Sequence, residues 1–244
     1  MIPKVIHYCW FGRGPLPQDA QKCIASWKKY MPDYEIKEWN EDNFDISSLP
    51  YTREAYGAKK YAFVSDYVRF WVLYNYGGVY FDTDVEVIAS VDDIIAAGPY
   101  MGKEIDGVGN QRQAVNPGLG FAAEPGMEIY RRFLEEYVEL HFILPDGSHN
   151  PYSMIRIITN MLEEEGLRPG TEIQRVAGVA IYPSEYFNPW DDTVGILRKT
   201  VNTRTVHWYS KSWMKQEAQW VVWVKRIMRR LFGKGIGEKI KRLI

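Results

Sequence analysis

Residues 61–87 determine the fold, and they read Tyr61-Ala-Phe-Val-Ser-Asp-Tyr-Val-Arg-Phe-Trp-Val-Leu-Tyr-Asn-Tyr-Gly-Gly-Val-Tyr-Phe-Asp-Thr-Asp-Val-Glu-Val87. Apolar side chains recur at positions 64, 68, 71 and 72, and this spacing predicts a helix. We expect Ser65 to cap the helix, with Asp66 in its first turn, where the helix dipole favours a negative charge. Gly77 and Gly78 end the helix. The apolar run 79–81 then predicts a short strand.

Two acidic side chains, Asp82 and Asp84, follow this strand directly. Side chains two apart on a strand point to the same side, so we expect both carboxylates to project together. They repel each other unless a cation lies between them, and Mn²⁺ or Mg²⁺ bound to phosphate oxygens is the usual partner. Asp66 and Arg69 share a helix face that we expect next to the metal. A solvated strand end and a surface ion pair remain the alternative interpretations.

The segments 65–69 and 76–84 resemble the DXD region of family 32 glycosyltransferases. That family includes bacterial capsular polysaccharide transferases and the yeast initiating mannosyltransferases. The segments are also similar, more distantly, to the catalytic domain of the clostridial glucosylating toxins. The resemblance implies an α/β fold of the GT-A type, a Rossmann-like nucleotide-diphospho-sugar transferase, over residues 1–213, with a basic amphipathic tail at 214–244.

The composition is that of one α/β domain with a sizeable core, because 46% of the 244 residues are hydrophobic. Aromatic residues make up 15%, and exposed rings stack on sugars and nucleobases. The net charge of −1 argues against a nucleic-acid partner. Two cysteines suggest no disulfide framework, and neither a signal-peptide pattern nor an apolar run of the ~20 residues that span a bilayer is present. We therefore expect a cytoplasmic location.

The N-terminal 40 residues predict a strand, a helix and a second strand, with a right-handed crossover. Loops beyond the carboxyl ends of such strands build ligand crevices. Residues 6–12 match the opening motif of the family, and the resemblance implies that His7, Tyr8 and Trp10 lie against the nucleobase and ribose. The alternative, that His7 and Trp10 belong to the core, stays open.

Two later segments complete the expected site. Asn116 resembles the asparagine that lies near the transferred sugar in the family, although Pro117 departs from the usual small residue, and an Asn that only forms the turn is the alternative. The stretch 205–213 resembles the His-x-x-x-Ser-Trp closure of the family. This resemblance assigns His207 to the metal, and Ser212 and Trp213 to the donor diphosphate. A lone histidine that is merely hydrogen-bonded is the alternative for His207.

The C-terminal segment 214–244 holds nine Lys/Arg against two Glu, a net charge of +7, which leaves −8 for the rest of the chain. Apolar residues and two tryptophans, Trp220 and Trp223, alternate with these basic residues. The pattern favours a helix at an anionic membrane surface, which would place the protein peripherally on the inner face of the cell membrane. A helix packed on the domain with a solvated basic face is the alternative.

The acidic pair predicts metal dependence, and the resemblance implies a retaining glycosyltransferase of surface polysaccharide synthesis. The donor would be a nucleotide sugar, UDP favoured over GDP, and the acceptor a glycan or lipid-linked glycan. We expect Asp84 to bind the metal directly, Asp82 to reach it through water or to hold the ribose, and Tyr80 to line the site. Asp66 and Arg69 would contact the hydroxyls of the donor sugar. No further carboxylate stands out as a nucleophile, which favours same-face attack assisted by the leaving phosphate.

Two other classes compete with this interpretation. Haloacid-dehalogenase phosphatases also place Asp-x-Asp after an apolar strand, with the first Asp as nucleophile. They require Thr or Val two residues after the second Asp, where this chain has Glu86, and a later acidic pair at a strand end, whereas Asp191 and Asp192 read as a loop. A non-catalytic carbohydrate-binding module would explain the aromatic residues but not a buried acidic pair.

Overall fold

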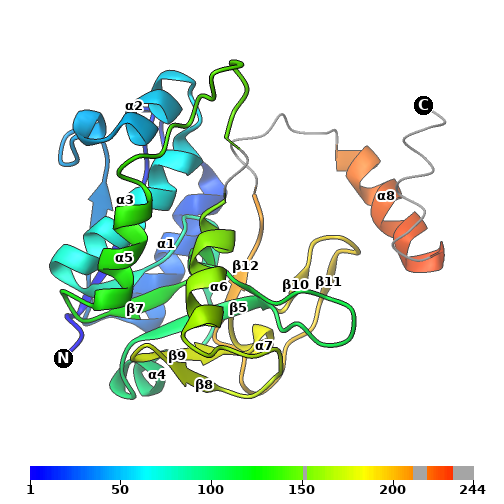
Figure 1. Cartoon of the computed structure of the whole chain (residues 1–244). Coiled ribbons are helices and arrows are strands. Elements are labelled where there is room, and N and C mark those ends of the chain that lie inside the picture. Colours follow the sequence, from blue (N-terminus) through cyan, green and yellow to red (C-terminus); the bar gives the residue numbers. More distant parts are fainter. Residues whose placement is uncertain (151–152, 211–218, 233–244) are drawn as a thin grey trace.

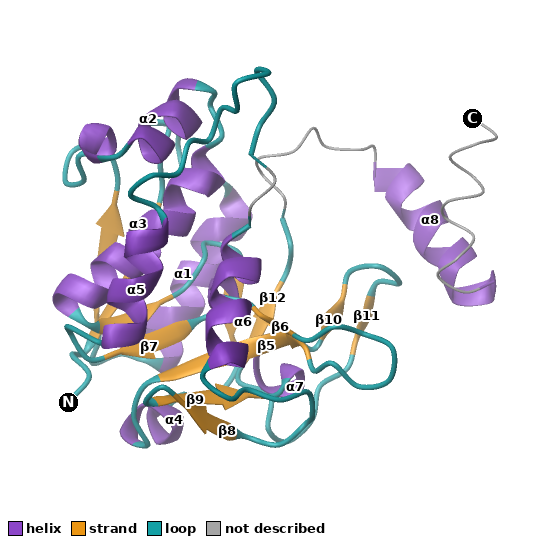
Figure 2. Cartoon of the chain, viewed as in Figure 1, coloured by secondary structure: helices purple, strands orange, loops and turns teal. Residues whose placement is uncertain are grey.

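The structure is a computed structural model that describes residues 1–150, 153–210 and 219–232. A central mixed sheet has the strand order β2-β1-β3-β7-β5-β9-β8, and β6, which lies off this path, pairs with β5. Helices lie on both faces of this sheet (Figures 1 and 2). The predicted α/β class is therefore confirmed.

The strands have the following bounds: β1 Val5–Cys9, β2 Glu35–Trp39, β3 Gly78–Tyr80, β4 Val85–Val87, β5 Tyr100–Ile105, β6 Ala114–Val115, β7 Phe121–Ala123, β8 Gln174–Val176, β9 Val179–Tyr182, β10 Trp190–Asp191, β11 Ile196–Leu197 and β12 Thr205–His207. The helices are α1 Gln18–Tyr30, α2 Pro50–Gly57, α3 Tyr61–Tyr76, α4 Asp92–Ala96, α5 Glu128–Glu136, α6 Met154–Glu164, α7 Ser184–Phe187 and α8 Gln219–Phe232.

The first half of the sheet is parallel. β1 pairs in parallel with both β2 and β3, as the predicted β-α-β order requires, so the carboxyl ends of these three strands meet at one edge. β7 then runs antiparallel to β3. Residues that follow β1, β2 and β3 consequently emerge at the same edge, which is where open α/β sheets bind their ligands.

Two apolar clusters cover the two faces of the sheet. One joins α3 to α5 and α6 and includes Phe70 stacked on Phe133, with ring centroids 3.7 Å apart. The other joins α1 and α4 to the opposite face, and its centre is the fully buried Trp27. The Trp27 indole packs 5.5 Å from the Phe81 ring and donates a 2.8 Å hydrogen bond to the carbonyl of Val85. Core packing thus fixes the chain on both sides of residues 82–84.

The start of α3 differs from the sequence prediction. The helix begins at Tyr61, with Lys60 at its N-cap, and Ser65 lies one turn inside it, where its hydroxyl donates to the Tyr61 carbonyl at 3.2 Å. Lys59 has a left-handed backbone with φ of +56°, which separates α2 from α3. Asp66 therefore gains nothing from the helix dipole, and its partner must be a side chain. The predicted end is confirmed, because Gly77 caps the helix with φ of +65°.

Among the described residues, we find no helix with the length and apolar character needed to cross a bilayer.

Candidate active site

Asp82 and Asp84 lie in a tight turn between β3 and β4. The Val85 amide donates to the Asp82 carbonyl at 3.0 Å, which closes the turn. The prediction that both acids continue the strand is wrong, because the chain leaves the central sheet here and β4 pairs antiparallel with β12 in a separate ribbon. The turn still brings the two carboxylates to one place, at the carboxyl end of β3.

Arg69 holds the first of these acids from α3. Its guanidinium is nearly buried, and Nη2 lies 3.2 Å from Asp82 Oδ1 and 3.1 Å from Asp66 Oδ1. The Tyr80 hydroxyl donates to the same Asp82 oxygen at 3.1 Å. Burial raises the pKa of Asp66 to about 6 and also raises that of Asp82, while Arg69 favours the charged form of both acids. The predicted pair of Asp66 and Arg69 is thus present and is joined to the acidic turn.

Asp84 is held by β12 and the residues that follow it. The β4–β12 pairing places His207 opposite Val85, and His207 Nε2 lies 3.1 Å from Asp84 Oδ1. The Ser210 amide donates to Asp84 Oδ2 at 2.8 Å. Burial alone would raise the pKa of Asp84, but His207 and Ser210 hold it below its usual range. Burial opposes protonation of His207, yet the neighbouring carboxylates raise its pKa.

The side chains of Asp82, Asp84 and His207 have the chemistry and spacing of a metal site. Each offers one ligand atom, and these atoms lie within 4.8 Å of one another. The buried Nδ1 of His207 has no hydrogen-bond partner among the described residues, so the internal contacts leave one ring nitrogen unused. Two carboxylates and an imidazole suit Mn²⁺ well and Mg²⁺ less well. The residues therefore fit a divalent cation.

Gly118 makes room for this group of acids. A Cβ atom at position 118 would lie 2.4 Å from Asp82 Oδ2 and 2.9 Å from Asn116 Oδ1. The Gly118 amide donates to Asn116 Oδ1 at 2.8 Å. Asn116 thus lies near Asp82 and forms the turn, as the alternative held, and its contact with the transferred sugar stays a prediction.

Glu104 and Tyr209 are site residues that the sequence reasoning missed. Glu104 Oε2 accepts a 3.0 Å hydrogen bond from Asn116 Nδ2, and the Tyr209 ring packs on His207 with centroids 4.2 Å apart. Burial and the nearby Glu104 carboxylate raise the pKa of Tyr209, whose backbone is left-handed with φ of +51°. Glu104 lies near the end of β5, and no motif in the sequence singles it out.

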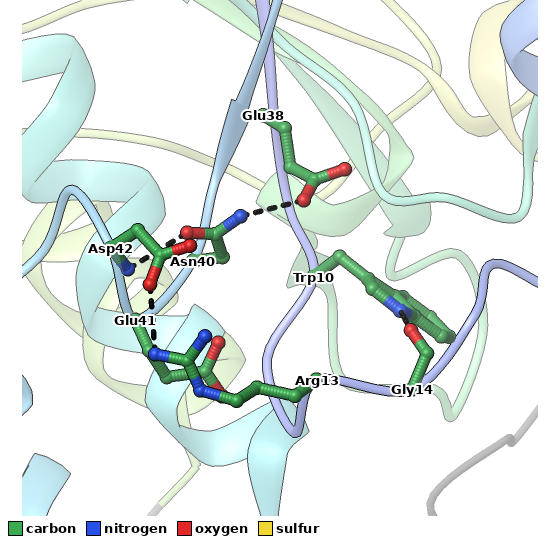
Figure 3. Close-up of a pocket in the computed structure, with 7 residues that line it drawn as sticks. All are labelled: Trp10, Arg13, Gly14, Glu38, Asn40, Glu41 and Asp42. Atoms are coloured by element: carbon green, nitrogen blue, oxygen red, sulfur yellow. Dashed lines mark hydrogen bonds and ion pairs between the residues drawn. The ribbon is translucent and has the colours of Figure 1, made fainter.

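A separate pocket of about 210 Å³ lies where β1 and β2 end (Figure 3). Trp10 is the aromatic side chain in its wall, and its indole donates to the Gly14 carbonyl at 2.7 Å. Polar and charged side chains form the rest of the lining: Arg13, Glu38, Asn40, Glu41 and Asp42. The Tyr8 hydroxyl donates to Glu38 Oε2 at 2.6 Å, so Tyr8 touches this pocket through Glu38. The arrangement offers one ring face and several hydrogen-bonding groups.

His7 lies below this surface with both ring nitrogens occupied. Nδ1 accepts a 3.0 Å hydrogen bond from the Trp39 indole, and Nε2 lies 3.0 Å from the Gly77 carbonyl, to which it donates. Burial lowers the pKa of His7 to about 4. These contacts are those of a core histidine, the alternative that the sequence left open. Ser212 and Trp213 lie outside the described residues.

Comparisons with known proteins agree with this geometry. Residues 17–100 match the model of the glycosyltransferase sugar-binding region containing the DXD motif, and the match includes Asp66, Arg69, Asp82 and Asp84. Inositol phosphoceramide mannosyltransferases 3 and 2 of Schizosaccharomyces pombe are 31% identical over 98 residues and 32% identical over 88 residues. These alignments cover 38% and 34% of this chain, and 27% and 25% of the relatives. The chain therefore spans about a quarter of the length of the curated relatives it matches.

One solved structure supports the fold, and a second is less similar. The PaToxG glycosyltransferase superposes with a TM-score of 0.51 at 18% identity, over 68% of this chain and 70% of that one. A glycosyltransferase involved in glycosylation of the major capsid of PBCV-1 gives a TM-score of 0.47 at 13% identity, over 86% and 95% of the two chains. The mixed α/β fold thus resembles that of GT-A glycosyltransferases, and residues 17–100 match the model of a sugar-binding region with the DXD motif.

Proposed function

We propose that this protein is a retaining glycosyltransferase that moves a sugar from a nucleotide-diphosphate donor to a glycan or lipid-linked glycan, with Mn²⁺ as cofactor. One observation carries the proposal: the ligand atoms of Asp82, Asp84 and His207 converge beside the Asp66–Arg69 pair at the carboxyl end of β3. The matched sugar-binding region supports the same reaction class.

Asp82, Asp84 and His207 would hold the cation. When bound, it supplies Lewis-acid neutralisation of the charge on the leaving diphosphate. The guanidinium of Arg69 donates to Asp66, to Asp82 and to the Ser65 carbonyl, so we assign Arg69 the role of orienting the two acids. Asp66, whose side chain is 19% exposed, is then the group that contacts hydroxyls of the donor sugar. Trp10 provides a ring face on which a nucleobase can stack.

Glu104 gives the site a further carboxylate. It fixes the amide of Asn116, which lies beside Asp82 and is the group that we place against the transferred sugar. We assign Glu104 the role of positioning that amide. We place the attack of the acceptor hydroxyl on the anomeric carbon at the same face as the departing nucleoside diphosphate. The diphosphate takes up the hydroxyl proton as its bond to the sugar breaks, and the anomeric configuration is retained.

The acceptor and location follow from the same proposal. The two curated relatives are named as mannosyltransferases of inositol phosphoceramide, a lipid acceptor. We propose a lipid-linked or polysaccharide acceptor for this chain in surface polysaccharide synthesis, and a cytoplasmic, membrane-peripheral location. The donor base is proposed to be uracil.

The test is hydrolysis and transfer from a panel of UDP- and GDP-sugars, with Mn²⁺ and after its removal by EDTA. We expect turnover that needs the metal and falls by about 10³-fold or more in Asp82→Asn and Asp84→Asn. Glu104→Gln should lower turnover and leave Mn²⁺ affinity unchanged. Asp33→Asn is the matched control, because Asp33 is a surface carboxylate whose side chain is 78% exposed.

Two results would contradict the proposal. The first is wild-type turnover in both the Asp82 and the Asp84 variants. The second is inactivity with every donor together with metal-dependent hydrolysis of p-nitrophenyl phosphate, which would favour a phosphatase.

A further inference from the structure

The described part of the C-terminal segment, α8, is fastened to the domain through arginines on one side. The acceptors are on the turn between β10 and β11, and most of them are backbone carbonyls. The contacts are Arg226 Nη2 with Asp192 Oδ1 at 2.7 Å, Arg229 Nη1 with the Thr193 carbonyl at 3.3 Å, and Arg230 with the Val194 and Gly195 carbonyls at 2.6 and 2.5 Å. Arg226 also lies 5.2 Å from the centre of the Trp190 ring. We call this set of contacts the arginine clamp.

The clamp leaves the apolar side of α8 uncovered. Successive helical residues turn by about 100°, so positions 220, 223, 224 and 231 fall on one stripe. Arg226 and Arg229 point away from this stripe, and Arg230 lies at its border, next to Trp223. Trp220 is 70% exposed, Trp223 63% and Leu231 69%. The stripe is roughly 16 Å long at 1.5 Å per residue. Figure 1 shows α8 at the edge of the molecule, beyond the β10–β11 turn.

An exposed stripe of this size and composition marks an interaction surface. Tryptophan is enriched where apolar and aqueous phases meet, because its ring is apolar and its N–H seeks a polar partner. The charge of the segment also favours a membrane surface. Residues 214–244 carry +7 and the rest of the chain −8, so an anionic surface attracts the segment and repels the domain.

A second copy of the chain is a poorer occupant. A two-fold contact through the stripe would bring the same segment of both copies together. Each copy would then contribute +7 to one interface, and like charges at close range oppose association. An anionic lipid surface has the opposite charge and an apolar interior, and it complements both properties of the segment.

We propose that α8 is a docking surface for an anionic lipid bilayer. Trp220, Trp223, Val224 and Leu231 enter the interface, and the arginine clamp keeps the helix lying along the domain with this stripe outward. Within α8 the basic residues are Lys225, Arg226, Arg229 and Arg230. In the clamp only Arg226 contacts a carboxylate, whereas Arg229 and Arg230 contact neutral carbonyls and keep their positive charge for the attraction to lipid headgroups. The proposal concerns binding alone and does not depend on the proposed transferase activity.

The test is flotation of the full-length protein with vesicles. One set contains phosphatidylcholine alone, and the other contains phosphatidylcholine with phosphatidylglycerol. We expect wild type to bind the anionic set preferentially, and the double variant W220S/W223S to bind it about tenfold or more weakly. V108S/V201S is the matched control, because Val108 and Val201 are 60% and 94% exposed and lie outside α8.

A second readout checks the variants and their folding. Vesicles should shift the tryptophan emission of wild type to shorter wavelength and leave that of W220S/W223S unshifted. Both double variants should melt at the wild-type temperature, because the replaced side chains are exposed. Equal flotation of W220S/W223S and wild type would overturn the proposal. So would a concentration-dependent dimer, seen by light scattering, that disappears in W220S/W223S, since a second copy would then be the occupant.

Discussion

At the scale of single residues, Arg69 makes two acids from different elements into one group. Asp66 comes from α3 and Asp82 from the turn after β3. Both carboxylates lie within hydrogen-bond distance of Arg69 Nη2, at 3.1 and 3.2 Å. Because the group is largely buried, removal of the arginine would leave two neighbouring carboxylates without its positive charge. The spacing of Asp66 and Arg69 in the sequence indicated their pairing, but the contact with Asp82 depends on how α3 packs on the sheet.

Gly118→Ala tests how much room the site needs. The new Cβ would meet Asp82 Oδ2 at 2.4 Å, and Asp82 cannot move freely because Arg69 and Tyr80 hold it. We expect the fold to remain and turnover to fall by about 100-fold, the usual cost of a misplaced reacting group. Activity assays and isothermal titration with Mn²⁺ give the two readouts.

Gly57→Ala is the control for this substitution, because a Cβ atom at position 57 would meet nothing within 4 Å. Unchanged turnover and Mn²⁺ affinity in Gly118→Ala would show that the site does not require the close approach of this backbone.

His7→Gln tests a stability effect that depends on pH. The folded protein holds His7 neutral, with its pKa near 4 against an ordinary value of 6.5. Below pH 6.5 the unfolded chain binds the proton first, so protonation costs wild-type stability about 1.4 kcal/mol per pH unit until about pH 4. Glutamine retains one acceptor for Trp39 and one donor for Gly77, and it does not titrate.

We therefore expect wild type to be more stable than His7→Gln at pH 7, and this advantage to shrink as the pH falls to 5. Urea unfolding of both proteins at several pH values measures it. A difference in unfolding free energy between the two proteins that stays constant over this pH range would show that His7 does not titrate with a depressed pKa.

At the scale of elements, the ribbon of β4 and β12 completes the site. Its pairing sets His207 opposite Val85, and the Trp208 amide donates to the Asp84 carbonyl at 3.0 Å. Trp27 of α1 and Ser26 hold β4 from the other side, through the Val85 carbonyl and the Val87 amide. The site therefore depends on a short ribbon that two distant parts of the chain support.

Arg226→Ala tests the arginine clamp. The side chains of Arg226 and Asp192 are both partly exposed, so their ion pair contributes about 1 kcal/mol, or roughly fivefold in a local opening equilibrium. We expect amide hydrogens of residues 190–197 to exchange faster by that factor, measured by mass spectrometry.

Arg131→Ala is the matched control, because Arg131 forms ion pairs with Glu128 and Glu135 that stay within α5. Exchange at 190–197 that is the same in Arg226→Ala and wild type would show that the clamp does not hold the turn.

At the scale of the whole molecule, local sequence patterns predicted the elements of the N-terminal part. The strand, helix and strand expected in the first 40 residues are β1, α1 and β2, and the expected helix and strand of residues 61–81 are α3 and β3. The start of α3 was misplaced because Ser65 has a capping side chain, whereas the backbone at Lys59 decides the boundary. The acidic pair was placed on a strand, since no local pattern revealed that β4 leaves the sheet.

The sequence predicted proximity where residues are close along the chain. Spacing indicated the pair Asp66 and Arg69 and the pair Asp82 and Asp84, but the contact between the two pairs depends on tertiary packing. Tertiary structure alone brings together three other residues of the site. They are Glu104 in β5, Gly118 in the turn that precedes β7, and Tyr209 after β12. The contact between Glu104 and Asn116 could not be read from the sequence.

The contact of Asp84 with the Ser210 amide joins residues 126 positions apart. A ribosome releases the acids of the turn long before it makes the strand that completes their surroundings, and domains begin to fold while they emerge. The nascent chain can therefore assemble β1, β2 and β3 around Trp27 while it still lacks a finished reaction centre. The site is complete only after β12 has been synthesised and has paired with β4.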